Sequence, residues 1–209
     1  MVGGLKLYAI PFSTNVERVR LALGHKGIDA QIVSVAPDDR RPVEAVSGQP
    51  LVPVLVDGEA LVADSLAILR HLERVQPEPP LFPRDARRAA EVDLFLAWFD
   101  RVWKVAPNAI EAELGKDTPD PARIDGLSAG LRADLRLFEG LLAQGDYLYG
   151  DFGAADCAAF PFLRYAIGCE AADTELFHRI LADHQPLGDS HPRLEDWIRR
   201  VDARPRGGR

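Results

Sequence analysis

The sequence predicts an α/β domain followed by an all-helical domain. Short stretches in which apolar and polar residues alternate, as is typical of strands, occur only before residue 64. Four prolines between Pro77 and Pro83 form a segment that cannot continue a helix. From Arg84 onward apolar residues recur at helical spacing. We therefore expect domains at 1–76 and 86–209, joined by a proline-rich linker at 77–85.

The first domain is predicted to have the element order β-α-β-α-β-β-α. A strand at 5–9 stops at Pro11, and a helix with its apolar side at Val16, Val19, Arg20 and Leu23 follows it. The remaining predicted elements are a strand at 31–35, a helical turn at 43–46, strands at 54–56 and 60–62 around an Asp57-Gly58 hairpin turn, and a helix from 63–65 to 76.

The second domain is predicted to contain helices only. The expected segments are a long helix at 86–107 that continues to 115 past a kink at Pro107, and helices at 119–142, 155–167, 175–184 and 192–203. Its first helix places Val92, Phe95, Leu96, Phe99, Val102 and Trp103 on one apolar side. The helix at 155–167 is apolar all round, which predicts a central position.

Composition narrows the class of protein. The 209 residues are 47% hydrophobic, carry a net charge of −7, and include no block of Lys or Arg of the kind that binds nucleic acid. No apolar run approaches the length of a membrane span. The two cysteines make no disulfide framework, which indicates a reducing, cytoplasmic setting. The histidines at 178, 184 and 191 lack metal-ligand spacing, so we expect no metal.

The turn after the first strand is the candidate chemical site. Ser13, Thr14 and Asn15 are residue types that favour helix N-caps. Free backbone N–H groups and the helix dipole favour a negative charge at such a position, so a thiolate, a carboxylate or a phosphate would suit it. The alternative is an ordinary strand-to-helix turn with a serine cap.

Four motifs, in order, resemble those of the glutathione transferase family over nearly the whole chain. They are PFSTNVERVRLAL at 11–23, similar to the serine-type zeta- and theta-like members; VPVL at 52–55; ADSLAI at 63–68; and Ala155-Asp156 with HPRLEDWIRRVDARP at 191–205. The implied fold is a thioredoxin-like domain followed by an all-helical domain. The implied activity uses glutathione as cosubstrate against small electrophiles, by conjugation, isomerisation or reduction.

The resemblance also implies roles for particular residues. Ser13 matches the catalytic serine, which donates a hydrogen bond to the sulfur of glutathione, with Thr14 and Asn15 able to assist. Val52, before a cis-Pro53, pairs its backbone with the cysteinyl unit. Asp64 and Ser65 hold the γ-glutamyl end of glutathione. Gln49 is assigned to the glycyl end.

The energy that such a site must supply is modest. A free thiol has a pKa of about 8.5, so only a few per cent is thiolate at neutral pH. Lowering that pKa by two units needs roughly 2.7 kcal/mol of preferential stabilisation. One hydroxyl hydrogen bond and the N–H groups of a helix start supply stabilisation of that order.

The sequence departs from the family pattern in two places. Gly153 replaces the usual Ser or Thr three residues before Asp156, which leaves more of the capping to Asp156. The segment VSGQPLVPVL also lacks the usual lead-in to the VPxL motif, which puts recognition of the glycyl carboxylate in question. The first turn contains no CxxC, so dithiol chemistry is not expected.

These observations lead to one main expectation and two alternatives. The main expectation is a homodimeric enzyme whose helices starting at Ser65 and Ala86 form the interface, with Leu72, Leu94 or Phe95 as apolar contacts. The alternatives are a non-catalytic protein of the same fold that acts through protein contacts, and an enzyme that uses a different low-molecular-weight thiol. The aromatic residues Phe95, Trp98 and Trp103 are compatible with an electrophile pocket and with core packing.

Overall fold

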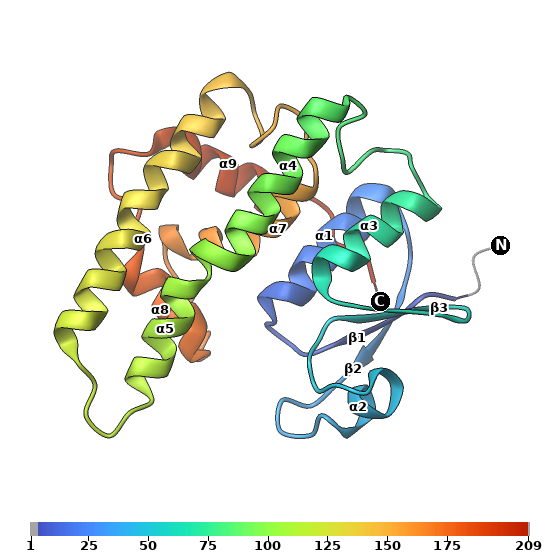
Figure 1. The fold of residues 1–209 in the computed structure, drawn as a ribbon, viewed down its shortest axis with the longest axis horizontal. Helices are drawn as coiled ribbons and strands as arrows, with labels where there is room; N and C mark the ends of the chain where they lie inside the picture. The colour runs from blue at the N-terminus through green and yellow to red at the C-terminus, as the bar shows by residue number, and fades with distance from the viewer. Residues whose placement is uncertain (1–3, 209) are drawn as a thin grey trace. The chain divides into compact units, whose positions relative to one another are not determined.

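The computed structural model describes residues 4–208, which form two compact units (Figure 1). The first unit runs to Ala89 and also includes the segment that starts at Arg204. The second unit is formed by Ala90–Ala203. The sequence had placed the segment from Arg204 with the helical domain, whereas in the structure it packs on the first unit.

In its described residues the first unit is a four-stranded mixed sheet with three helices, followed by the start of a fourth. Its elements are β1 (Lys6–Ala9), α1 (Thr14–Lys26), β2 (Gln31–Ser34), α2 (Arg41–Ser47), β3 (Val54–Asp57), β4 (Ala60–Ala63) and α3 (Ser65–Val75). The strand order is β2-β1-β3-β4, with β2 parallel and β3 antiparallel to β1, and β4 antiparallel to β3. The order β-α-β-α-β-β-α confirms the prediction, and the unit is thioredoxin-like.

Alternation along the strands gives the sheet two apolar faces. Leu7 pairs with Leu55 in the β1–β3 register, and both are fully buried. Their neighbours Tyr8 and Val54 belong to a cluster with Val43 of α2. Successive strand residues point to opposite faces, so the cluster with Tyr8, Val54 and Val43 lies on the α2 side of the sheet, and Leu7 and Leu55 lie on the other side. Figure 1 shows α1 and α3 on the other side.

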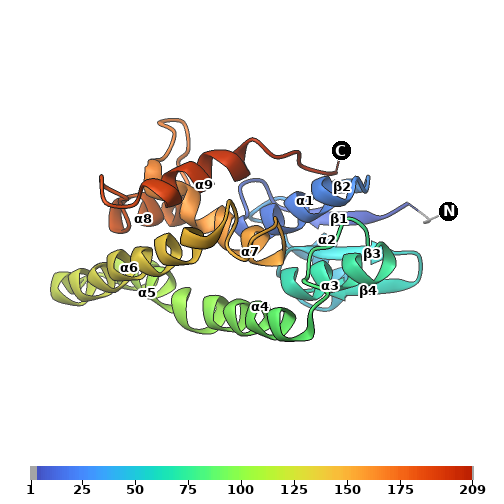
Figure 2. The ribbon, with the colours of Figure 1, turned by 90° about the horizontal axis from the view of Figure 1, so that it is seen from above.

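The second unit contains helices and short turns only. The helices are α4 (Ala86–Trp98), whose first residues belong to the first unit, α5 (Val105–Leu114), α6 (Pro121–Leu141), α7 (Ala154–Leu163), α8 (Leu176–His184) and α9 (Pro192–Asp202) (Figures 1 and 2). A π-helical segment occupies Phe99–Trp103, and 3-10 turns occupy Leu142–Gln144 and Arg164–Ile167. Every residue of α7 is buried, which confirms its predicted central position.

The break in the first long helix is not at Pro107, as the sequence suggested. The Lys104 N–H donates to the Phe99 carbonyl at 3.0 Å, five residues back, which is the hydrogen bond of a π-helix. The extra residue rotates the chain, so Val102 is 58% exposed although the predicted apolar side included it. Pro107 lies in the first turn of α5, where a missing N–H costs little.

The aromatic residues of this region pack mainly on one another. Trp103 stacks on Phe99 with ring centroids 4.6 Å apart, and both are buried. Phe95 is 5% exposed and meets Phe138 edge-on. Core packing is therefore the role of Phe95 and Trp103 within this unit, while Trp98 is only partly buried.

The structure corrects two of the three suggested dimer contacts. Leu72 is completely buried inside its own unit and Phe95 nearly so, which leaves neither side chain available to a second subunit. Leu94 is 73% exposed and is available. Helical periodicity marks an apolar face but does not say whether that face meets its own core or a partner. In the described part of the chain no helix is long and apolar enough to cross a membrane.

Candidate functional site

Strand register brings the three motifs of the first unit to one edge of the sheet. Tyr8 of β1 pairs with Val54 of β3, and Val54 pairs with Ala63 of β4. The chain that leaves β1, the chain that enters β3 and the chain that leaves β4 therefore meet at the same end. These segments carry Ser13, Val52-Pro53 and Asp64-Ser65.

Ser13 is the N-cap of α1 and keeps its hydroxyl proton available. Its Oγ accepts a hydrogen bond from the Val16 N–H at 3.3 Å, so Ser13 is the helix cap that its residue type predicted. Among the described residues no acceptor pairs with the Ser13 O–H, and the side chain is partly exposed. A hydroxyl donates one bond and accepts two, so the cap and donation to a ligand are compatible. Thr14 and Asn15 are the first residues of α1 and are also partly exposed.

Two non-glycine residues in the described chain have a positive φ, and both flank this edge. Phe12, directly before Ser13, has φ 64°, and Asp64, directly before α3, has φ 80°. Such values are uncommon for residues with a Cβ and persist where the surrounding structure holds them, often at functional sites. The Phe12 side chain is 68% exposed.

Val52 presents its backbone because its side chain is held in the core. The side chain packs against the cluster of Ile10, Val35, Val43 and Val54. The Val52–Pro53 peptide bond is cis, as the resemblance implied. Neither the N–H nor the C=O of Val52 has a hydrogen-bond partner in the described residues. These two groups can pair with an extended peptide in the manner of an added strand.

Asp64 and Ser65 start α3 in different environments. One carboxylate oxygen of Asp64 caps the helix, accepting from the Leu66 N–H at 2.9 Å and the Ala67 N–H at 3.0 Å. The residue is exposed, so its other oxygen can meet a ligand amine. Ser65 is only 3% exposed, and its backbone N–H lies in the first turn of the helix, where such groups have no partner within the helix.

Arg18 lies at the candidate site, where sequence reasoning did not place it. It is completely buried on α1, and its guanidinium donates to the Ser65 Oγ at 3.2 Å, which links the helix of Ser13 to the start of α3. The sequence had placed Arg20 on the buried side, but Arg20 is only partly buried and faces elsewhere. A shift of two residues along a helix changes the direction of a side chain by about 200°.

The amide of Gln49 is used within its own loop. Its Nε2 donates to the Ser47 Oγ at 3.3 Å and to the Leu51 carbonyl at 2.9 Å, and its Oε1 accepts from the Leu51 N–H at 2.7 Å. Both amide hydrogens are therefore occupied. The structure does not bring this side chain into the site as an available donor.

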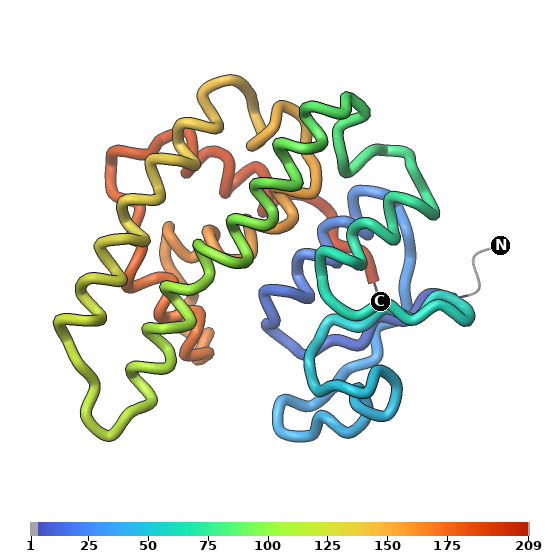
Figure 3. Tube along the Cα trace, in the orientation of Figure 1, coloured from blue at the N-terminus to red at the C-terminus, as the bar shows by residue number. Residues whose placement is uncertain are grey.

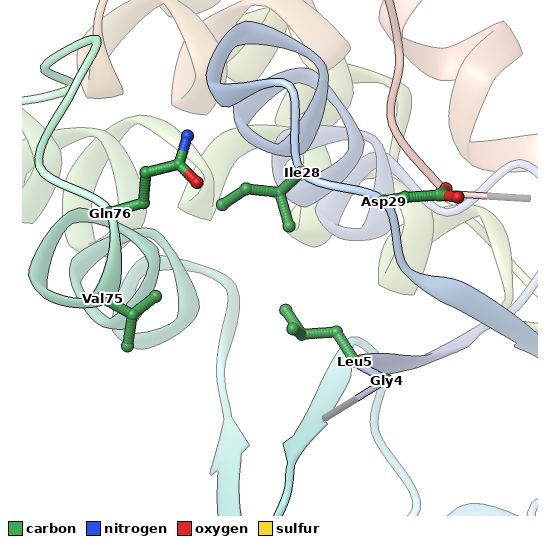
Figure 4. Close-up of a pocket in the computed structure, with 6 residues that line it drawn as sticks. All are labelled: Gly4, Leu5, Ile28, Asp29, Val75 and Gln76. Carbon is green, nitrogen blue, oxygen red and sulfur yellow. The ribbon is translucent and has the colours of Figure 1, made fainter. Parts of the chain in front are cut away.

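A cavity of about 240 Å³ lies at the opposite end of β1 (Figure 4). It is lined by Gly4, Leu5, Ile28, Asp29, Val75 and Gln76. Leu5 precedes β1, whereas Ser13 follows it, so this cavity is separate from the Ser13 edge. Among the residues described, no group of three or more His, Cys, Asp or Glu side chains could hold a metal ion.

Both units of the chain have relatives among known proteins. Residues 7–80 match the glutathione S-transferase N-terminal domain, and residues 121–200 match the C-terminal domain of that family. A zeta-class glutathione S-transferase from Euphorbia esula is 31% identical over 193 residues, covering 87% of this chain and 84% of the relative. The FtsZ-localized protein A of Caulobacter vibrioides is 32% identical over 168 residues, covering 71% and 73%.

A solved structure has the same architecture. The theta-class glutathione S-transferase of Xanthomonas axonopodis pv. citri, determined with glutathione bound, superposes with a TM-score of 0.73 at 21% identity and covers 98% of this chain and 95% of its own. The motifs, the two-unit fold and the matches to both domains together show that the chain belongs to the glutathione S-transferase family.

Proposed function

We propose that this protein is a glutathione transferase in which Ser13 activates the thiol of glutathione. The observation that carries the proposal is the hydroxyl proton of Ser13, which has no acceptor within the described chain although its oxygen is fixed by the α1 cap. Donation of this proton in a hydrogen bond to sulfur favours the thiolate over the thiol. Thr14 and Asn15 border the same position.

The rest of the edge supports recognition of the peptide. The unpaired N–H and C=O of Val52 suit the cysteinyl unit, and the exposed oxygen of Asp64 suits the α-amine of the γ-glutamyl unit. The N–H of Ser65 suits the carboxylate at that same end. Gln49 is a weaker candidate for the glycyl end because its amide hydrogens are already occupied.

The reaction we propose is attack by this thiolate on a small electrophile. A new S–C bond forms while a leaving group such as halide departs with the bonding electrons, or while an activated double bond takes up a proton. The thiol proton goes to solvent when the thiolate forms. We also propose a homodimer, with Leu94 as one apolar contact, and a cytoplasmic location in keeping with two free cysteines.

A second candidate is a protein of this fold that acts through protein contacts. The similarity to FtsZ-localized protein A favours it, since that relative is named for its localisation and not for a reaction. A third candidate retains the chemistry but uses another low-molecular-weight thiol.

Calorimetric titration of the full chain separates these candidates. We expect glutathione to bind with proton release near neutral pH, and S-methylglutathione, which cannot ionise at sulfur, to bind without it. Binding of a different thiol alone would support the third candidate. Absence of binding by any thiol would overturn the proposal and leave the protein-contact function.

A further inference from the structure

The segment 204–208 lies along helix α1 within the first unit (Figures 1 and 3). The Gly207 N–H donates to the Arg20 carbonyl at 2.8 Å, and the Arg20 Nε donates to the Gly207 carbonyl at 3.4 Å. An Arg204 Nη lies 2.9 Å from the His25 Nδ1. The segment is thus held through main-chain as well as side-chain contacts.

The close approach depends on glycine at two positions. A Cβ on Gly24 would lie 2.6 Å from the Pro205 carbonyl carbon, with the Pro205 oxygen nearer still. A Cβ on Gly207 would lie 2.5 Å from the Leu23 Cβ and 2.9 Å from the Gly24 nitrogen. These separations are shorter than real Cβ contacts, so α1 and the segment pack this closely only with glycine at both positions.

The segment also places a positive charge on α1 one turn from Ser13. The Arg206 Nε lies 2.7 Å from the Glu17 Oε1, and the two side chains are only 17% and 19% exposed. The Glu17 N–H donates to the Ser13 carbonyl at 3.0 Å, so Glu17 is in the first turn of α1. Uncompensated, its carboxylate would oppose an anion held at that end of the helix.

We propose that segment 204–208 is a positioning element of the thiol site, in which Arg206 offsets the charge of Glu17 and the Gly24–Pro205 contact keeps Arg206 in place. This inference rests on the proposed function for its chemical consequence but not for the docking of the segment. Arg206 does not touch the thiol, and it acts through Glu17.

The other charged side chains near the start of α1 do not offset the charge of Glu17 in place of Arg206. Arg18 is directed to the start of α3, and Arg20 to the carbonyl of Gly207. Asp64 caps α3 with its carboxylate and supplies no positive charge. Arg206 is the cation that the structure pairs with Glu17.

A charge cycle tests the electrostatic part. The pKa of the bound thiol is measured from its thiolate absorbance against pH in the wild type, R206Q, E17Q, the double variant and R206K. We expect R206Q to raise that pKa by about half a unit and E17Q to lower it. The double variant should return close to the wild type, and R206K should retain the wild-type value because it keeps the charge.

This result differs from that of a purely structural role. Loss of a structural contact would leave the double variant at least as impaired as R206Q, and that outcome would overturn the proposal. Equal thiol pKa values in R206Q and the wild type would overturn it too.

The docking part has its own test, which needs no thiol. G24A should expose the amides of α1 to hydrogen exchange several-fold faster, since the new methyl displaces Pro205. The matched control is G126A in α6, where a Cβ meets nothing within 4 Å and exchange should be unchanged or slower. Unchanged exchange in G24A would overturn the docking. Should the wild type bind no thiol, the proposed function fails while this comparison still decides the docking.

Discussion

The starts of helices α1 and α7 are built in opposite ways. At α1, Ser13 accepts one backbone N–H, and Ser13, Thr14 and Asn15 are partly exposed. At α7, Gly153 brings no side chain, and Asp156 replaces it from inside the helix, accepting from the Gly153 N–H at 2.9 Å. Asp156 also accepts from the Leu148 N–H at 3.1 Å and the buried Trp197 Nε1 at 2.7 Å.

The start of α1 is accessible to a ligand, whereas the start of α7 is buried in the core of its unit. Asp156 joins a turn, its own helix and α9, and it is only 1% exposed. Burial raises the pKa of Asp156 to about 6, although hydrogen bonds, first among them that from the Leu148 N–H, act to lower it. At α1 the cap uses only the oxygen of Ser13, and its hydroxyl proton has no acceptor in the described chain. The helix start is therefore stabilised without using this proton.

The largest effect should come from removing the buried carboxylate. D156A leaves three N–H groups without an acceptor, and we expect it to lower the free energy of unfolding by roughly 4 kcal/mol. Urea unfolding followed by circular dichroism measures this change. The control D183A removes an exposed carboxylate and should stay within about 0.5 kcal/mol of the wild type. Equal urea midpoints for D156A and D183A would contradict the role given to Asp156.

The same group predicts a pH dependence of stability. Its pKa in the folded protein, about 6, exceeds its ordinary value of 3.8, so above pH 4 the unfolded chain loses the proton first. The free energy of unfolding therefore falls as the pH rises from about 4 through 6, by up to roughly 3 kcal/mol. The difference between wild type and D156N, measured across this range, isolates the effect. A difference that does not change with pH would show that the carboxylate does not titrate there.

At α1 the largest loss should be in turnover and not in stability. S13A removes both the cap and the donor, so we expect about 1 kcal/mol of destabilisation and roughly a hundredfold fall in turnover with a model aryl halide. S13G is the matched variant, because glycine caps nearly as well as serine. It should keep the stability and lose the same turnover. Wild-type turnover in S13G would remove Ser13 from the mechanism.

The smallest effect we predict concerns the link between α1 and α3. R18M keeps the buried volume but removes the donor to Ser65, so the start of α3 loses one support. We expect glutathione affinity to fall about tenfold, or about 1.4 kcal/mol, with the turnover of the bound complex changed less. R132M, at an exposed position of α6, serves as the comparison. Equal losses in the two variants would argue against a particular role for Arg18.

Local sequence signals predicted most elements and the candidate residues. Alternation predicted the strands, and the Ser13 cap, the Asp57-Gly58 turn and the proline-rich stretch marked boundaries that the structure keeps. The π-helical segment could not be predicted, because an apolar repeat of three and four residues looks the same across one inserted residue. The buried position of Arg18 was equally hidden, since a charged residue is normally assigned to the surface.

The sequence by itself determined the order of elements, the family and the residue types at the Ser13 turn, because these depend on neighbours along the chain. Tertiary structure decided which motifs share an edge, since the register of β1 with β3 joins residues that are more than forty positions apart. It also decided that Leu72 faces its own core and that the segment from Arg204 packs on α1. Burial and close packing depend on what lies opposite a residue in space, which its sequence neighbours do not specify.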